Sequence, residues 1–177
     1  MPTTTTAMPP VPKVTEADIL QFLAAARETI AAVPICWLAT RSLEGGTNAR
    51  AVNSSAGSPG SDEWTRRFLT RRSARKVAEI RRAPRVTLAY QANSGDAYIA
   101  LAGLAHPVED RAQMRSLWNT KLDALFPDGF ADANMIVVRV EIDRIELHAR
   151  GVTAEPFGHG RTVIERVAAD GWRFAPD

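Results

Sequence analysis

Tight turns separate most of the strands that this sequence predicts, and they constrain the fold more than any other feature. The segments 35–41 and 47–55 read as strands, and because only a turn at 43–46 joins them, they predict a β-hairpin. A parallel doubly wound sheet needs helical crossovers, which connections of this length do not supply. The sheet is therefore expected to be antiparallel.

Three helices accompany the predicted strands. One starts at Thr15, with Asp18 in the capping-box position, and continues up to Pro34; the others are expected at 74–82 and 111–126. The remaining strands are expected at 64–70, 85–91, 97–108 with a bend or bulge at Gly103, 134–149, 161–167 and 171–174. Six to eight antiparallel strands and three helices in this order predict a mainly β (α+β) fold, a small closed or split β-barrel with helices packed outside.

The length of 177 residues suits one domain. Residues 1–13 are rich in Pro and Thr, which predicts a disordered tail ahead of a single domain at 14–177. Hydrophobic and charged contents of 45% and 24% are those of a soluble globular protein. The apolar runs are too short to span a bilayer and the N-terminus lacks the features of a signal peptide, so we expect a cytoplasmic protein without a membrane partner.

Few side chains are suited to nucleophilic or metal chemistry. Cys36 is the single cysteine and lies in an apolar run, which favours a buried thiol and excludes an intrachain disulfide. His106, His148 and His159 are scattered without metal-ligand spacing, so no metal site is expected. The sequence also contains neither a nucleophile-elbow motif nor a dinucleotide-binding glycine motif.

The segment 64–85 is strongly basic, although the formal net charge of the chain is only +2. It contains one acid, Glu79, against nine basic residues: Arg66, Arg67, Arg71, Arg72, Arg75, Lys76, Arg81, Arg82 and Arg85. Such a field suits a phosphorylated small molecule or a nucleic acid. Because the basic side chains are not interleaved with exposed aromatic ones and the net charge is small, nucleic acid is disfavoured.

Residues 68–76 run from a strand end through a turn into the predicted helix 74–82, whose first turn carries Arg75 and Lys76. A helix N-terminus presents unpaired N–H groups and the positive end of the helix dipole, and with added cations it holds a phosphate. The alternative is a solvated basic helix with Ser73 as an ordinary N-cap.

Four segments match a known family in order and spacing: Arg50-Ala51-Val52 on a hairpin strand, FLTRRSARKVAEIRRAPRV at 68–86, YIALAGLAHPVED at 98–110 and LWNTKLDALFPDGF at 117–130. This combination resembles the pyridoxamine 5′-phosphate oxidase-like FMN-binding split-barrel superfamily, and within it the general-stress-protein branch. The resemblance covers roughly residues 15–150. It implies a homodimer with FMN at the subunit interface.

The resemblance also implies which residues bind FMN. Residues 50–52 match the strand that lines the flavin ring and phosphate side, and Leu69 and Thr70 match the strand end whose backbone meets the isoalloxazine ring. Arg75 and Lys76 match the basic pair that grips the phosphate. An arginine fork and a lysine point charge beside a helix N-terminus suit a dianionic phosphate.

Several positions depart from the family pattern. A serine usually precedes the basic pair directly, whereas here Ala74 holds that place and Ser73, a candidate to supply its hydroxyl, lies one residue earlier. Ser55 lies near the place of a lysine in the oxidase proper, and Tyr98 near that of a flavin-contacting glutamine. Trp118 is expected on the apolar face of its helix, either in the core or as a wall of the flavin pocket.

The C-terminus ends GWRFAPD instead of the Arg-Leu-x-Pro tail with which the oxidase binds its pyridoxal substrate. Oxidation of pyridoxamine phosphate is therefore not predicted. The resemblance instead predicts an FMN-binding protein that acts as a flavin-dependent oxidoreductase on an unknown small substrate. The alternative is a carrier or stress sensor that binds FMN, FAD or a deazaflavin without turnover.

Overall fold

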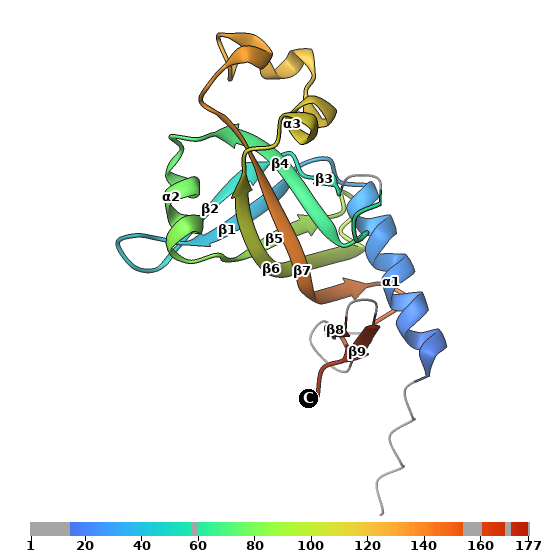
Figure 1. The fold of residues 1–177 in the computed structure, drawn as a ribbon. Coiled ribbons are helices and arrows are strands. Elements are labelled where there is room, and N and C mark those ends of the chain that lie inside the picture. Colours follow the sequence, from blue (N-terminus) through green and yellow to red (C-terminus); the bar gives the residue numbers. More distant parts are fainter. Residues whose placement is uncertain (1–14, 58–59, 154–160, 169–170, 177) are drawn as a thin grey trace, which may run out of the picture.

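A computed structural model describes residues 15–57, 60–153, 161–168 and 171–176 (Figure 1). The predicted tail at 1–13 lies outside these residues. The described helices are α1 (Glu16–Ala31), α2 (Arg75–Arg82), α3 (Arg111–Leu117) and two short 3-10 turns, Thr120–Leu122 and Gly129–Ala131. The described strands are β1 (Cys36–Arg41), β2 (Thr47–Val52), β3 (Ser55–Ala56), β4 (Thr65–Arg71), β5 (Arg85–Gln91), β6 (Ala97–Val108), β7 (Met135–Ala149), β8 (Val163–Ala168) and β9 (Gly171–Phe174).

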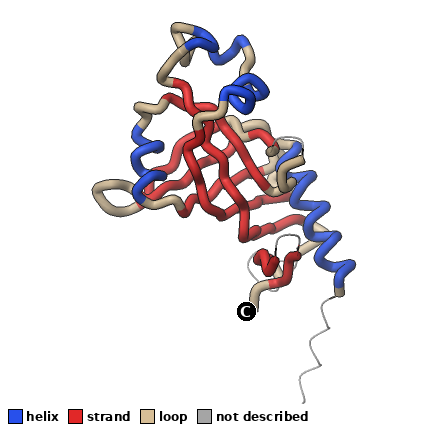
Figure 2. The backbone as a smooth tube through the Cα atoms, in the orientation of Figure 1, coloured by secondary structure: helices blue, strands red, loops and turns tan. Residues whose placement is uncertain are grey.

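These strands form one sheet in the order β2-β1-β5-β6-β7-β4-β3, and β8 and β9 extend it from β7. The pairings are antiparallel, and the sheet curls into a split barrel with α1 and α2 outside it (Figures 1 and 2). The predicted architecture is thus confirmed.

No helix of the described residues is long and apolar enough to cross a membrane.

The predicted strand 47–55 is broken in the structure, and the break closes the barrel. β2 ends at Val52 and β3 begins at Ser55, so Asn53 and Ser54 alone separate the two strands at opposite ends of the sheet order. β2 pairs with β1, whereas β3 pairs with β4. The single strand predicted here was wrong because the chain crosses from one sheet edge to the other.

The long pair β6–β7 bends at Gly103, as predicted. The register shifts between Ala102 and Gly103. A Cβ at Gly103 would lie 2.1 Å from the carbonyl oxygen of Glu141, so a residue with a side chain would collide with the neighbouring backbone. The bulge increases the curl that brings the sheet edges together.

The helix predicted at 111–126 is shorter in the structure. α3 ends at Leu117, and Trp118 adopts an extended conformation with φ −68° and ψ 137°. The side chain of Asn119 then accepts a hydrogen bond from the N–H of Lys121 at 3.1 Å and starts a 3-10 turn. The prediction failed because this local side-chain bond competes with helix continuation. In contrast, the capping box of Thr15 and Asp18 is present as predicted.

Two apolar clusters meet along β4. Phe68 belongs to the barrel core with residues such as Leu38, Leu88 and Leu101, while Leu69 packs against a smaller cluster of Met114, Phe126, Met135 and Val137. Alternation along the strand sends neighbouring side chains to opposite faces. The smaller cluster holds the lobe that follows β6 (residues 109–134) against β7 and β4. Figure 1 shows this lobe at one end of the barrel.

Candidate functional site

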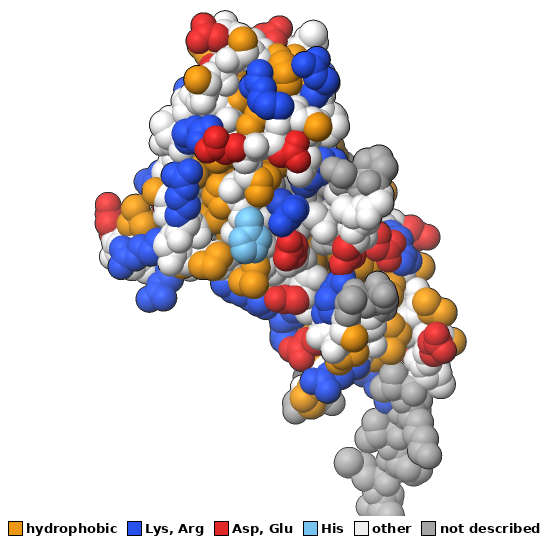
Figure 3. Space-filling model, in the orientation of Figure 1, with side chains coloured by type: hydrophobic (Ala, Val, Ile, Leu, Met, Phe, Trp, Pro, Cys, Tyr) orange, Lys and Arg blue, Asp and Glu red, His pale blue; other side chains and the backbone are white. Residues whose placement is uncertain are grey.

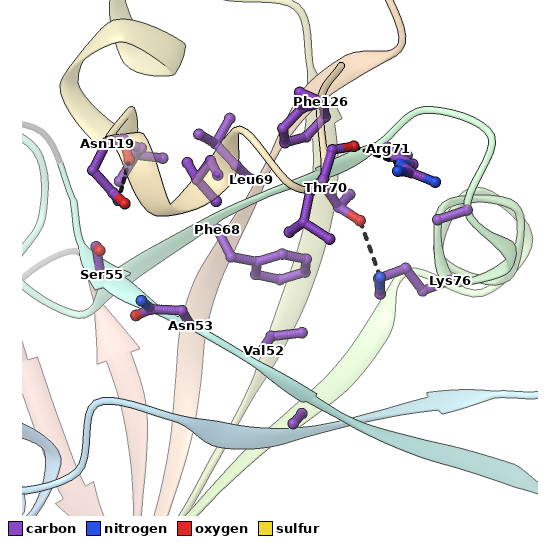
Figure 4. A pocket seen from close by; sticks show the side chains of 15 residues that line it. Val52, Asn53, Ser55, Phe68, Leu69, Thr70, Arg71, Lys76, Asn119 and Phe126 are labelled. Carbon is purple, nitrogen blue, oxygen red and sulfur yellow. Dashed lines mark hydrogen bonds between the residues drawn. The ribbon is translucent and has the colours of Figure 1, made fainter. Parts of the chain in front are cut away.

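A cavity of about 410 Å³ opens where β4, the β2–β3 crossing, the start of α2 and the lobe come together. Five of the residues predicted from the sequence line it: Ala51, Val52, Leu69, Thr70 and Lys76. These residues belong to β2, β4 and α2. The fold therefore brings together side chains that lie as far apart in the sequence as positions 51 and 76. Figure 4 shows the cavity from close by.

One end of the cavity is positively charged. Lys76 points from α2 towards β4, and its Nζ donates a hydrogen bond to Thr70 Oγ1 at 3.0 Å (Figure 4). Burial lowers the pKa of Lys76, and the nearby charge of Arg50 lowers it further, whereas Glu79 acts in the opposite direction. This ammonium group is therefore partly stripped of water, and no carboxylate of the described residues bonds to it, which suits it to an anionic ligand.

The N-terminus of α2 lies at the same end. Ala74 is the N-cap residue and lines the cavity, and no side chain caps the helix there. The N-terminal N–H groups of α2 therefore add to the positive charge of Lys76. The alternative of Ser73 as the N-cap is wrong: its N–H donates to Asn134 Oδ1 at 2.9 Å, and its hydroxyl accepts from Asn134 Nδ2 at 3.0 Å.

The two predicted arginines do not line the cavity. The side chain of Arg75 is 73% exposed, and its Nε lies 3.4 Å from Oε1 of Glu79. Arg50 donates from Nη2 to Oε2 of Glu79 at 2.7 Å, and its Nη1 donates to Thr40 Oγ1 and to the carbonyl of Asn48. Both arginines thus point to one buried carboxylate.

Glu79 is a residue whose role the sequence reasoning missed. It is fully buried and accepts hydrogen bonds from Thr40, Asn48 and Arg50. Burial raises the pKa of Glu79, but these hydrogen bonds and the charge of Arg50 outweigh burial, so the pKa is lowered overall. The signal was present in the sequence, since Glu79 is the one acid in the basic stretch 64–85.

The rest of the cavity has apolar walls and a few amides and hydroxyls. Phe68 lies between Lys76 and the end at which Asn53 and Ser55 lie (Figure 4). Asn119 of the lobe also lines the cavity, and it was not among the predicted binding residues although the matching segment 117–130 contains it. An apolar cavity with a few polar groups at its ends is typical of sites for small aromatic ligands.

Two predicted residues lie elsewhere. Trp118 is half-buried in the lobe, with its ring centroid 6.0 Å from that of Phe126 and 5.9 Å from that of Phe130, which is core packing. Tyr98 lines a second cavity of about 340 Å³ with residues that include Trp37. β6 lies three strands from β2, so Tyr98 is about 14 Å from the strand of Ala51 at the usual strand spacing.

The charge distribution beyond the cavity forms no single basic patch on the face in Figure 3, where Lys and Arg side chains are scattered among acidic and apolar ones. Arg72 pairs with Glu109, Arg85 with Asp143 and Arg166 with Asp62. Within the described ranges, His, Cys, Asp and Glu side chains form no cluster that could hold a metal ion.

A protein-family model described as pyridoxamine 5′-phosphate oxidase like matches residues 23–151. The chain therefore belongs to the pyridoxamine 5′-phosphate oxidase-like family. The match includes β1 to β7 and hence every residue that lines the first cavity. A search of curated protein sequences returned no significant match.

Solved structures with this fold include General Stress Protein 26 from Bacillus anthracis, which is 19% identical, with 73% of this chain and 93% of that chain covered and a TM-score of 0.62. A pyridoxamine 5′-phosphate oxidase-related, FMN binding protein from Nostoc punctiforme is 14% identical. The alignment covers 89% of this chain and 93% of that chain, with a TM-score of 0.61. The general stress FMN/FAD binding protein of Xanthomonas citri is 19% identical. The alignment covers 73% of this chain and 88% of that chain, with a TM-score of 0.57. At these identities the likeness shows the shared fold.

Proposed function

We propose that this protein binds FMN in the first cavity and acts as a flavin-dependent oxidoreductase on a small substrate. One observation carries the proposal: Lys76 and the uncapped N-terminus of α2 meet at one end of a largely apolar cavity. A phosphate suits the charged end and a flat ring suits the apolar part. The names of similar structures from Nostoc punctiforme and Xanthomonas citri support a flavin as the ligand.

The residues present fit FMN. The volume of about 410 Å³ lies in the range of small-molecule sites. Lys76 and the first N–H groups of α2 would hold the phosphate, Val52 and Leu69 would contact the ring, and Asn53 and Ser55 would hydrogen-bond its polar edge. Bound FMN would supply hydride or electron transfer, and these residues would bind and orient it.

Oxidation of pyridoxamine phosphate itself is not proposed. The C-terminal strand β9 packs on the molecule, with Trp172 5.7 Å from Trp64 and Phe174 5.5 Å from Phe22 between ring centroids. Its sequence also differs from the substrate-binding tail of the oxidase. The substrate would therefore differ from that of the oxidase.

We further propose that FMN lies at the interface of a homodimer. The outer face of β2, β1, β5 and β6 carries a row of small or flat side chains in cross-strand register: Ala51, Trp37, Ala89 and Ala100. Trp37 is 60% exposed, which is unusual for an indole on a surface that stays in water. A second subunit on this face would cover Trp37 and bring its own Tyr98 towards the flavin of the first.

A carrier or stress sensor without turnover is the second candidate. The residues that line the first cavity, as far as the chain is described, include no Asp, Glu, His, Cys or Tyr. Lys76 is the one titratable group of this lining whose pKa is lowered, and the proposed phosphate contact would occupy it. This composition favours either chemistry carried by the flavin alone or simple binding.

The test starts with the absorption spectrum of the purified protein after addition of FMN and removal of the unbound excess. We expect retained flavin bands, and a colourless protein would contradict FMN binding. Lys76→Ala should weaken FMN binding by about 10- to 100-fold, because a charge-assisted contact is lost. The matched control is Lys121→Ala, which removes an exposed lysine of the lobe and should leave the affinity unchanged.

Stopped-flow mixing of the FMN-loaded protein with NADH or NADPH separates the two candidates. Reduction of the flavin followed by reoxidation with a small acceptor supports an oxidoreductase. A flavin that neither nicotinamide reduces supports the carrier or sensor.

A further inference from the structure

The one acid in the basic stretch 64–85 faces the inside of the molecule. Glu79 is fully buried in α2, as are the apolar residues Val77 and Ile80. A carboxylate in such a position costs solvation energy and persists only where hydrogen bonds and an opposite charge compensate.

The compensation comes from the β1–β2 hairpin. Thr40 Oγ1 donates to Oε2 of Glu79 at 2.6 Å, and Asn48 Nδ2 donates to Oε1 at 2.6 Å. Arg50 Nη2 donates to Oε2 at 2.7 Å. Three side chains from β1 and β2 thus fix one carboxylate of α2, and with it the orientation of the helix relative to the strand that carries Ala51.

This network decides which basic group reaches the cavity. Arg50 is occupied by Glu79, Thr40 and the Asn48 carbonyl, so Lys76 is the cation that α2 contributes to the cavity, beside Arg71 of β4. Glu79 also offsets the effect of Arg50 on Lys76: Arg50 disfavours the charged form of Lys76, and Glu79 favours it. Loss of the carboxylate would therefore both release the helix and weaken the charge that faces a ligand.

We infer that Glu79 is a positioning residue for phosphate binding, which holds α2 and Arg50 in place behind Lys76 without touching the ligand. The inference rests on the proposed function, because the phosphate is that of FMN. It predicts that Glu79 governs the preference of the site for FMN over riboflavin, which has the same ring but no phosphate.

The experiment measures the dissociation constants of FMN and riboflavin by quenching of flavin fluorescence, for the full chain and its Glu79→Gln variant. A glutamine keeps the size of the side chain but carries no charge. Its NH₂ group cannot accept the hydrogen bonds that Thr40, Asn48 and Arg50 donate to the carboxylate. We expect FMN binding to weaken by about tenfold and riboflavin binding by less than about twofold. The matched control is Glu63→Gln, which removes a carboxylate bonded to Arg27 at the surface and should change neither constant.

Two results would overturn the inference. FMN and riboflavin weakening by the same factor would give Glu79 a purely structural role, and unchanged or tighter FMN binding would mean that it does not support the phosphate site. If Glu79→Gln does not fold, Asn48→Ala removes one hydrogen bond to the carboxylate, and the same selective loss is expected at about threefold. A wild-type protein that binds no FMN would instead refute the proposed function, so the two failures are distinguishable.

Discussion

Two helical regions bound the cavity, and they are held by different forces. α2 is fixed by a buried carboxylate with three hydrogen bonds from β1 and β2. The lobe at 109–134 is held by the small apolar cluster around Phe126 and by a hydrogen bond from Arg71 Nε to the carbonyl of Leu125 at 2.7 Å. Directional bonds fix one orientation, whereas apolar packing specifies shape more than direction. The wall that must aim a charge is thus fixed at a buried carboxylate, whereas the lobe combines an apolar cluster with polar contacts at the surface, such as that of Arg72 with Glu109.

The largest expected effect is on the lobe. Phe126→Ala should lower the free energy of unfolding by about 3–4 kcal/mol, because it empties the centre of the small cluster. Urea denaturation measures this loss. Leu125→Ala removes an exposed neighbour as the control and should cost about 0.5 kcal/mol or less. Equal losses in the two variants would mean that the cluster does not hold the lobe.

Glu79→Gln should lower the free energy of unfolding by about 3 kcal/mol at pH 7, because buried donors lose their charged partner. The pKa of Glu79 is lowered in the folded state. The charged carboxylate therefore stabilises the folded protein above the pKa of an unfolded glutamate, about 4.3. This stabilisation is lost as the pH falls through the pKa of the folded state. The difference between wild type and variant should therefore shrink below about pH 4. A difference in melting temperature that stays constant with pH would contradict this assignment.

Arg71→Ala probes the tie between the lobe and β4. Loss of its hydrogen bond to Leu125 should cost about 1 kcal/mol, since the side chain is exposed. Native-state hydrogen exchange should show faster exchange of the amides at 117–130, with α2 as the internal control. Faster exchange in α2 by the same factor would show that the two regions are not held independently.

The smallest expected effect is that of Arg75→Ala on FMN binding. The Arg75 side chain is largely exposed and lies near Glu79, so the affinity should change by about twofold or less. Titration of the variant beside Lys76→Ala measures the contrast between two adjacent residues. A loss of FMN affinity equal to that of Lys76→Ala would show that Arg75 also binds the phosphate.

The sheet was predictable where side chains alternate. β5, β6 and β9 begin and end at the predicted residues, because their alternation and flanking turns depend on the local sequence. The breaks at Asn53 and Trp118 were not predictable in this way. The first depends on closure between distant sheet edges, and the second on a side-chain bond from Asn119 to the Lys121 N–H.

The site was predictable as a region more than as a set of contacts. The sequence predicts the helix start with Lys76 and the strand end with Thr70 as parts of the site, and both residues line the cavity. The sequence did not separate Lys76 from Arg75, because one residue along a helix turns the side chain by about 100° and only packing fixes that rotation. It also did not pair Arg50 with Glu79, which lies 29 residues away on another element.

A crystal structure of the full chain with FMN tests the central claim most directly. The account predicts the phosphate within hydrogen-bond distance of Lys76 Nζ and the first N–H groups of α2, with Arg50 still bonded to Glu79. A phosphate bound by Arg75 on the solvent side of α2, or by an Arg50 that has left Glu79, would contradict the account.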